Sequence, residues 1–138
     1  MIKRILLSLL LVVCVSFLTP TNTYASHLMG GEITWVCLPS GAFKFKMILY
    51  RDCNGVPGPA STSLQTNAPA PGGTIPLVLQ SQTDVSPVGI GCTGTCASPS
   101  PFGGNVEEFI YESLPVFLTG VPPAGGWWFA YDNCCRNA

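Results

Sequence analysis

Residues 42–51 read Ala-Phe-Lys-Phe-Lys-Met-Ile-Leu-Tyr-Arg, and the spacing of apolar side chains in this stretch decides the fold class. One set of alternate positions is wholly apolar and consists of Phe43, Phe45, Met47 and Leu49. The intervening set consists of Lys44, Lys46, Ile48 and Tyr50. A period of two is the pattern of a β-strand with one buried face. The sequence therefore predicts a strand whose apolar face meets the core.

The chain on both sides continues the β pattern. Residues 32–38 are dense in β-branched and aromatic side chains, and Pro39-Ser40-Gly41 supplies turn chemistry before 42–51, so the two runs form a hairpin. Shorter strand-like runs follow at 61–65, 74–83, 106–118 (interrupted at Pro115) and 127–131. Pro76 lacks an N–H for a sheet ladder, which places its strand at a sheet edge or makes it a strand start.

No stretch has the period of an amphipathic helix. Loops are predicted at 54–73 and 89–104, where Pro, Gly, Ser, Thr and Asn are frequent. The predicted fold class is therefore all-β, with short antiparallel strands packed as an immunoglobulin-like (Ig-like) β-sandwich.

The first 25 residues have the features of a secretory signal. Basic residues Lys3 and Arg4 precede an apolar run over 5–18, and Thr23-Tyr24-Ala25 offers the small residues of a cleavage site. We expect a signal peptide over 1–25 and a mature chain that starts at Ser26. The apolar run is shorter than the roughly 20 residues that cross a bilayer, so no membrane span is expected in the mature chain.

Cysteine usage agrees with export. Of the seven cysteines, Cys14 lies in the signal peptide and six remain: Cys37, Cys53, Cys92, Cys96, Cys134 and Cys135. An even set in an oxidising compartment predicts three disulfides. A bond between the neighbours Cys134 and Cys135 is strained, and the hairpin places Cys37 and Cys53 at opposite ends, so neither pairing is expected. The remaining connectivities stay open.

Composition excludes several function classes. The chain has six basic and seven acidic residues, and loss of Lys3 and Arg4 with the signal leaves a net charge of −3, so nucleic acid is not an expected partner. The only histidine, His27, lies next to the mature terminus. Histidine-assisted nucleophilic catalysis needs a base that a third group holds in place. We therefore expect no enzyme activity.

Acidic and thiol groups also lack the spacing of catalytic or metal sites. Glu107 and Glu108 are adjacent on a predicted strand, so their carboxylates point to opposite faces, and solvated strand charges are expected. The cysteines lack the zinc-site spacing of two intervening residues. The oxygen ligands Asp52, Asn54 and Asp84 lack the calcium-loop pattern. No cofactor or metal is expected.

The aromatic cluster near the end of the chain holds the best binding candidate. Alternation over 127–131 sends Trp127, Phe129 and Tyr131 to the core and leaves Trp128 outside. An exposed tryptophan can stack on a sugar or dock a partner. Tyr50 is a second candidate platform for stacking.

Three stretches together resemble a known family. They are Ser26-His27-Leu28-Met29-Gly30-Gly31-Glu32-Ile33-Thr34-Trp35, Leu49-Tyr50-Arg51-Asp52-Cys53, and Trp127-Trp128-Phe129-Ala130-Tyr131-Asp132-Asn133-Cys134-Cys135-Arg136-Asn137. The chain is similar there to the N-terminal region of large gliding-motility-associated surface proteins, which are adhesin-like, contain PKD repeats and leave the cell by the type IX secretion route. This resemblance implies no active-site residue. It implies that further domains follow in the same polypeptide, so that 26–138 is an extracellular β-domain truncated at its C-terminal end.

Two functions from different classes follow. The first is a non-enzymatic extracellular module of a bacterial cell-surface or secreted adhesin-like protein, with an extracellular protein or glycan surface as its partner. The alternative is a carbohydrate-binding accessory module of a secreted hydrolase, with Trp128 and Tyr50 as stacking platforms.

Overall fold

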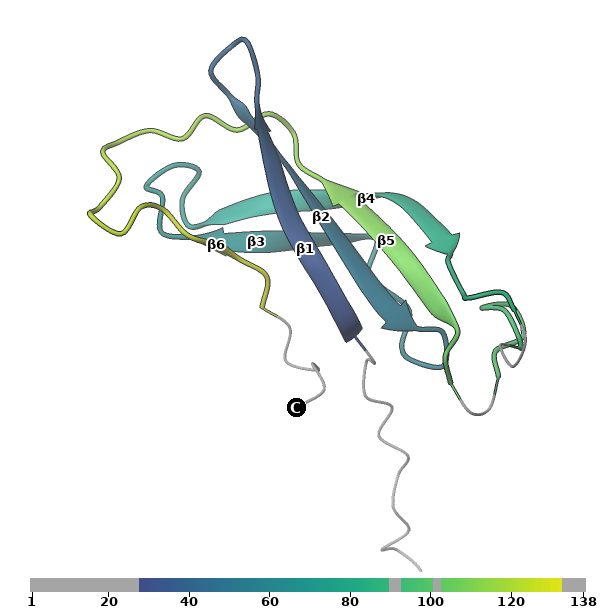
Figure 1. Cartoon of the computed structure of the whole chain (residues 1–138). Coiled ribbons are helices and arrows are strands. Elements are labelled where there is room, and N and C mark those ends of the chain that lie inside the picture. The colour runs from purple at the N-terminus through teal and green to yellow at the C-terminus, as the bar shows by residue number, and fades with distance from the viewer. Residues whose placement is uncertain (1–27, 90–92, 101–102, 133–138) are drawn as a thin grey trace, which may run out of the picture.

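The computed structural model describes residues 28–89, 93–100 and 103–132, and all of its regular structure is β (Figure 1). The strands are β1 Leu28–Cys37, β2 Phe43–Asp52, β3 Ser61–Thr66, β4 Thr74–Asp84, β5 Val106–Glu112 and β6 Phe129–Ala130. The described residues contain no helix, and every strand pair is antiparallel. The predicted all-β, antiparallel class is confirmed. The predicted signal peptide, its cleavage before Ser26, and His27 lie outside the described residues.

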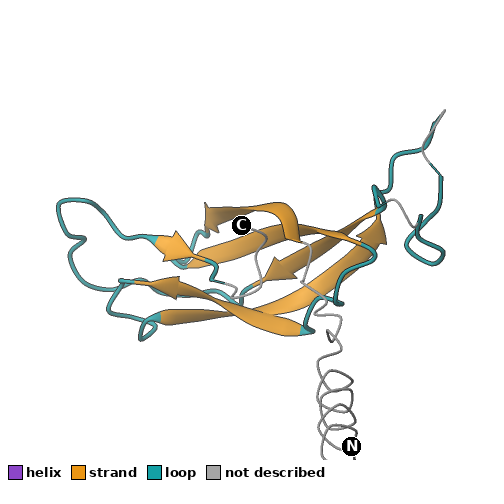
Figure 2. Ribbon diagram, turned by 90° about the horizontal axis from the view of Figure 1, so that it is seen from below, coloured by secondary structure: helices purple, strands orange, loops and turns teal. Residues whose placement is uncertain are grey.

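The six strands form one sheet in the order β1-β2-β5-β4-β3-β6. Strand β4 belongs to both halves of it: residues 74–78 pair with β3, whereas residues 78–84 pair with β5. The register shifts between Leu79 and Ser81, and such an irregularity lets a strand bend and turn a corner between layers. The sheet therefore folds over, and Figure 2 shows its strands as two facing layers.

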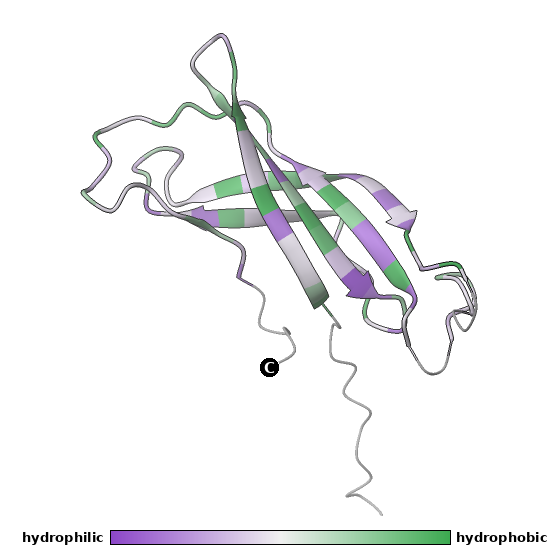
Figure 3. Ribbon diagram, in the orientation of Figure 1, coloured by the Kyte–Doolittle hydropathy of each residue, from purple (hydrophilic) through white to green (hydrophobic). Residues whose placement is uncertain are grey.

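Side chains from both layers meet in one core. The buried cluster comprises Phe45, Met47, Leu49, Leu64, Ile75, Leu77, Phe109 and Tyr111. Figure 3 shows the alternation of apolar and polar residues along β2 and β5 that sends one face of each strand inward. The rings of Phe45 and Phe129 lie 4.7 Å apart although β2 and β6 are remote in the strand order. The two layers thus pack face to face within a single continuous sheet.

The predicted hairpin is present. Strand β1 pairs with β2 from Leu28↔Arg51 to Cys37↔Phe43. In the turn, Leu38 N–H donates to the Ala42 carbonyl at 2.7 Å, and Gly41 has a φ of +81°, a conformation that glycine adopts without strain.

Two strand predictions extended too far. The run over 106–118 ends as a strand at Glu112, and the run over 127–131 contributes only Phe129 and Ala130. Pro115 removes a ladder donor in the first run. The second run is short because only two residues of β3, Gln65 and Thr66, pair with it.

Pro76 lies where the sheet needs no hydrogen bond from its backbone nitrogen. Its strand β4 is internal in the sheet order, but Pro76 lies in the half that pairs with β3 alone, opposite Ser63. Its missing N–H therefore faces a local edge, as predicted.

The structure contains a disulfide between Cys53 and Cys96, with a Cα–Cα distance of 5.0 Å. The predicted absence of a bond between Cys37 and Cys53 is confirmed. Cys37 was expected to pair, but among the described residues it is an exposed free thiol, and the other two described cysteines, Cys53 and Cys96, are bonded to each other. The candidates Cys92, Cys134 and Cys135 lie outside the described residues.

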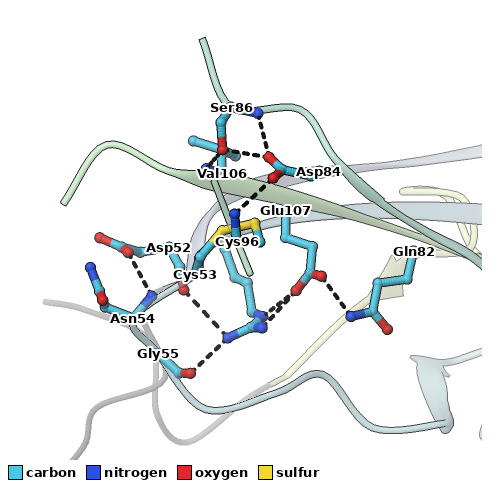
Figure 4. Close-up of polar contacts among 11 residues, drawn as sticks. Asp52, Cys53, Asn54, Gly55, Gln82, Asp84, Ser86, Cys96, Val106 and Glu107 are labelled. Atoms are coloured by element: carbon cyan, nitrogen blue, oxygen red, sulfur yellow. Dashed lines mark hydrogen bonds and ion pairs between the residues drawn. A yellow bond between two sulfur atoms is a disulfide. The ribbon is translucent and has the colours of Figure 1, made fainter. Parts of the chain in front are cut away.

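A buried ion pair joins β2 to β5 at the end of the molecule that contains the disulfide. Arg51 donates from Nη2 and Nε to Glu107 Oε2, at 2.6 and 3.0 Å, and both side chains are about nine-tenths buried. Figure 4 shows the Glu107 carboxylate also receiving a hydrogen bond from Gln82 and shows the Gly55 carbonyl as a further acceptor. One expectation is corrected here, because Glu107 is a buried ion-pair partner and not a solvated charge. Arg51 pairs across the sheet and not with the carboxylate of the neighbouring Asp52.

Candidate binding surface

The segment between β5 and β6 places apolar side chains in solvent. Leu114 is 82% exposed, Phe117 60% and Val121 90%. The same segment is held against the sheet, since Val116 and Phe43 exchange two backbone hydrogen bonds of 2.8 Å and Leu118 packs against the core. We call residues 113–128 the apolar loop. Its inward side chains fix the backbone, and its outward ones are presented to the surroundings.

Trp128 lies at the end of the apolar loop and is 49% exposed. Its backbone N–H donates to Asn67 Oδ1 at 2.8 Å, which ties the residue to the β3–β4 connection. The predicted exposure of Trp128 is confirmed, and Phe129 and Tyr131 pack against the core as expected. Trp127 was predicted to be core but is only half-buried, because it precedes the short strand β6.

Tyr50 points away from the core, on the outer face of β2. It lies between Gly30 and Glu108 in the sheet, and its hydroxyl donates to Glu108 Oε2 at 3.1 Å. This hydrogen bond raises the pKa of Tyr50. Trp128 belongs to the segment that precedes β6, in the opposite layer. The structure therefore does not bring the two predicted stacking residues into one platform.

A groove of about 220 Å³ runs between β1 and Tyr131, the residue that follows β6. Its wall and floor include Leu28, Gly31, Ile33, Met47 and Leu49. Trp35 lies farther along the same face of β1 and is 56% exposed, and its ring centroid is 6.2 Å from that of Phe129. Trp35 was not among the predicted binding residues, and alternation of side chains along β1 does not by itself reveal this exposure. The cause is that β1 is the last strand of the sheet.

The oxygen-bearing side chains that were considered and set aside for calcium, those of Asp52, Asn54 and Asp84, make separate hydrogen bonds. Asp52 accepts a hydrogen bond from the Asn54 N–H, whereas Asp84 binds the Ser86 side chain and the Cys96 N–H. These bonds, that of Ser86 first, hold the pKa of Asp84 below its ordinary value. The described part of the chain contains no group of three or more histidine, cysteine or acidic residues arranged to hold a metal. It also contains no helix long and apolar enough to cross a membrane.

Burial of Tyr111 predicts a loss of stability at alkaline pH. Its hydroxyl donates to the Pro59 carbonyl at 3.0 Å, and burial, with a smaller effect of Tyr131, raises its pKa to about 12. The folded state therefore keeps the proton at a pH where the unfolded state releases it, so stability is full below pH ~10 and falls as the pH rises toward ~12. Urea unfolding at a series of pH values measures this decline. It should persist in Tyr50→Phe and be much reduced in Tyr111→Phe; an equal decline in both variants would assign it to another group.

Comparison with known proteins found no family model, no curated protein and no solved structure that matches this chain.

Proposed function

We propose that this chain is a non-enzymatic extracellular module of an adhesin-like bacterial surface protein, and that it attaches to an extracellular partner through the apolar loop. The observation that supports this most directly is the exposure of Leu114, Phe117 and Val121 on a backbone fixed by Val116. Large apolar groups held in solvent mark interaction sites on folded proteins, and binding residues are commonly placed on loops that a rigid scaffold supports.

Two further observations agree with the proposal. A disulfide between Cys53 and Cys96 is typical of proteins that work in oxidising compartments outside the cytosol. The resemblance of three stretches to gliding-motility-associated surface proteins points to the cell surface and to export by the type IX route.

The carbohydrate-binding alternative rests on Trp128 alone. A single exposed indole is a sufficient stacking surface for one sugar ring, but Tyr50 does not extend it, because Tyr50 lies on the other layer with its hydroxyl bound to Glu108. A glycan array on the oxidised protein distinguishes this alternative: specific glycan binding that Trp128→Ala abolishes would favour it over a protein partner.

Attachment should depend on the outward side chains of the apolar loop. Phe117→Ala and Trp128→Ala should each reduce the attachment of cells that express the full-length protein severalfold, with the unfolding free energy changed by less than about 0.5 kcal/mol, as is usual for surface residues. The matched control is Val88→Ala, because Val88 is 97% exposed and lies outside the apolar loop. Protease shaving of intact cells reports equal surface display. Normal attachment by both loop variants at equal display would refute the assignment of this surface.

A further inference from the structure

The free edge of β1 is the strongest feature that the proposed function does not use. Strand β1 has ten residues and ends the sheet order. Within the described residues its only strand partner is β2, so alternate residues direct their N–H and C=O groups outward with no strand to receive them. Natural proteins protect such edges with proline, with charged side chains, lysine above all, or with bulges. Strand β1 contains neither proline nor lysine; its one charged residue is Glu32, and its one irregularity lies at its start, between Leu28 and Gly30.

We propose that β1 pairs antiparallel with β1 of a second copy of this chain, about a two-fold axis at Ile33, so that the sheet continues across the dimer. A two-fold interface uses the same patch on both subunits, so the patch must complement itself. The sequence of β1 meets this condition in shape and in charge.

The shape complementarity comes from glycines at one end of the strand and large side chains at the other. With Ile33 opposite Ile33 of the partner subunit, Trp35 faces Gly31 of the partner subunit and Val36 faces Gly30 of the partner subunit. Trp35 and Val36 are each 56% exposed in the single chain. Aromatic residues opposite glycine on antiparallel strands cover the gap that the glycine leaves. Val36 thus meets open space at Gly30, whereas Trp35 covers Gly31, whose face Leu49 of the same chain already contacts.

Gly30 supports this argument because its own chain does not require a glycine. A Cβ at Gly30 would meet nothing within 4 Å, and its φ is not positive. Gly31 differs, since a Cβ there would lie 2.5 Å from the Ile48 carbonyl oxygen. The open space above Gly30 is thus available to the Val36 side chain of the partner subunit.

The charge complementarity involves Glu32 and Lys46. In its own chain Glu32 lies opposite Ile48, and within the described residues neither Glu32 nor Lys46 belongs to a salt bridge. In the proposed register Glu32 faces Thr34 of the partner subunit, whose neighbour on β2 is Lys46. Strands are spaced about 4.8 Å apart, so a glutamate and a lysine two strands apart can reach each other across the small threonine. The dimer contains this pair twice.

Neighbouring registers are less favourable. An axis at Glu32 places the two Glu32 carboxylates directly opposite each other, which is destabilising. An axis at Thr34 places Val36 opposite Glu32 and loses the fit between Trp35 and Gly31. Registers with an axis between residues would place side chains from opposite faces together. The axis at Ile33 is the one that satisfies both shape and charge.

Sedimentation equilibrium of the exported, oxidised chain tests the proposal. The wild-type protein should be dimeric at micromolar concentration. Glu32→Lys should weaken the dimer at least about tenfold, because two attractive pairs become repulsive. Combining Glu32→Lys with Lys46→Glu should restore most of the lost affinity. Val88→Lys places a lysine at an exposed site outside β1 and should leave the dimer unchanged.

The outcomes separate clearly. A monomer at all concentrations up to about a millimolar would overturn the proposal, and so would a dimer that Glu32→Lys leaves intact or that the double variant fails to rescue. Trp35→Ala provides a second route, since it removes the proposed contact with Gly31 and should also dissociate the dimer. Circular dichroism of each variant separates dissociation from unfolding. Because the apolar loop is a different surface, attachment by Phe117→Ala cells is unrelated to this result.

Discussion

Arg51→Ala is expected to lower the free energy of unfolding by about 3–5 kcal/mol, the usual loss when one partner of a buried ion pair is removed. The Glu107 carboxylate, about nine-tenths buried, would keep only the hydrogen bond from Gln82. The substitution also removes the 2.7 Å bond from Arg51 Nη1 to the Gly55 carbonyl and the stacking of the guanidinium over Phe109, at 5.4 Å from the ring centroid. The fold would thus lose the hydrogen bond that joins loop 53–60 to the sheet as well as the ion pair.

Denaturant unfolding of oxidised protein measures this effect, and Lys44→Ala is the matched control. Lys44 forms an ion pair with Glu112, but the two side chains are 39% and 30% exposed. Exposed pairs contribute at most about 1 kcal/mol. Equal losses in the two variants would show that burial does not determine the strength of the Arg51 pair.

These ion pairs show that the sequence predicts which face of a strand is buried but not which residues pair across the sheet. Alternation over 42–51 correctly predicted which side chains of β2 enter the core, because a strand with one buried face repeats every two residues. The same rule places Arg51 and Glu107 on the inner face, yet the sequence does not tell that they are partners, since they lie 56 residues apart. The carboxylate nearest to Arg51 in the sequence is that of Asp52, and it is not the partner. Pairing across a sheet depends on strand order, which a single sequence leaves open.

Strand order also explains why Trp35 is exposed and why the prediction that Trp127 is core was wrong. Alternation directs Trp35 inward, but a residue on the last strand of a sheet has a neighbour on one side only, so it remains 56% exposed. Trp127 belongs to the predicted strand over 127–131, of which only two residues, Phe129 and Ala130, pair with β3. Periodicity predicts the face of a strand, whereas burial also requires that another element cover that face. Trp128 needed no such cover, and its exposure was predicted correctly.

Removal of the Cys53–Cys96 disulfide is expected to cost about 4 kcal/mol. The bond closes a loop with a sequence separation of 43 residues, and the chain-entropy relation gives about that value for a loop of this length at 25 °C. The loss is a large part of the roughly 5–15 kcal/mol that stabilises a typical domain. Cys53→Ser combined with Cys96→Ser, compared with the oxidised wild type in denaturant unfolding, measures it.

The matched control is Cys37→Ser, because Cys37 is an exposed free thiol at the end of β1 and its replacement should change the unfolding free energy by less than about 0.5 kcal/mol. A control as unstable as the double variant would mean that Cys37 forms a disulfide in solution.

The Cys53–Cys96 disulfide also has a local structural effect. It joins the end of β2 to the loop after β4, where the Cys96 N–H donates to Asp84 at 2.7 Å. Since Asp84 lies opposite Glu107 in the sheet, the disulfide and the Arg51–Glu107 pair secure the same end of the fold. The double variant and Arg51→Ala should therefore be non-additive when combined, as expected for groups that share neighbours.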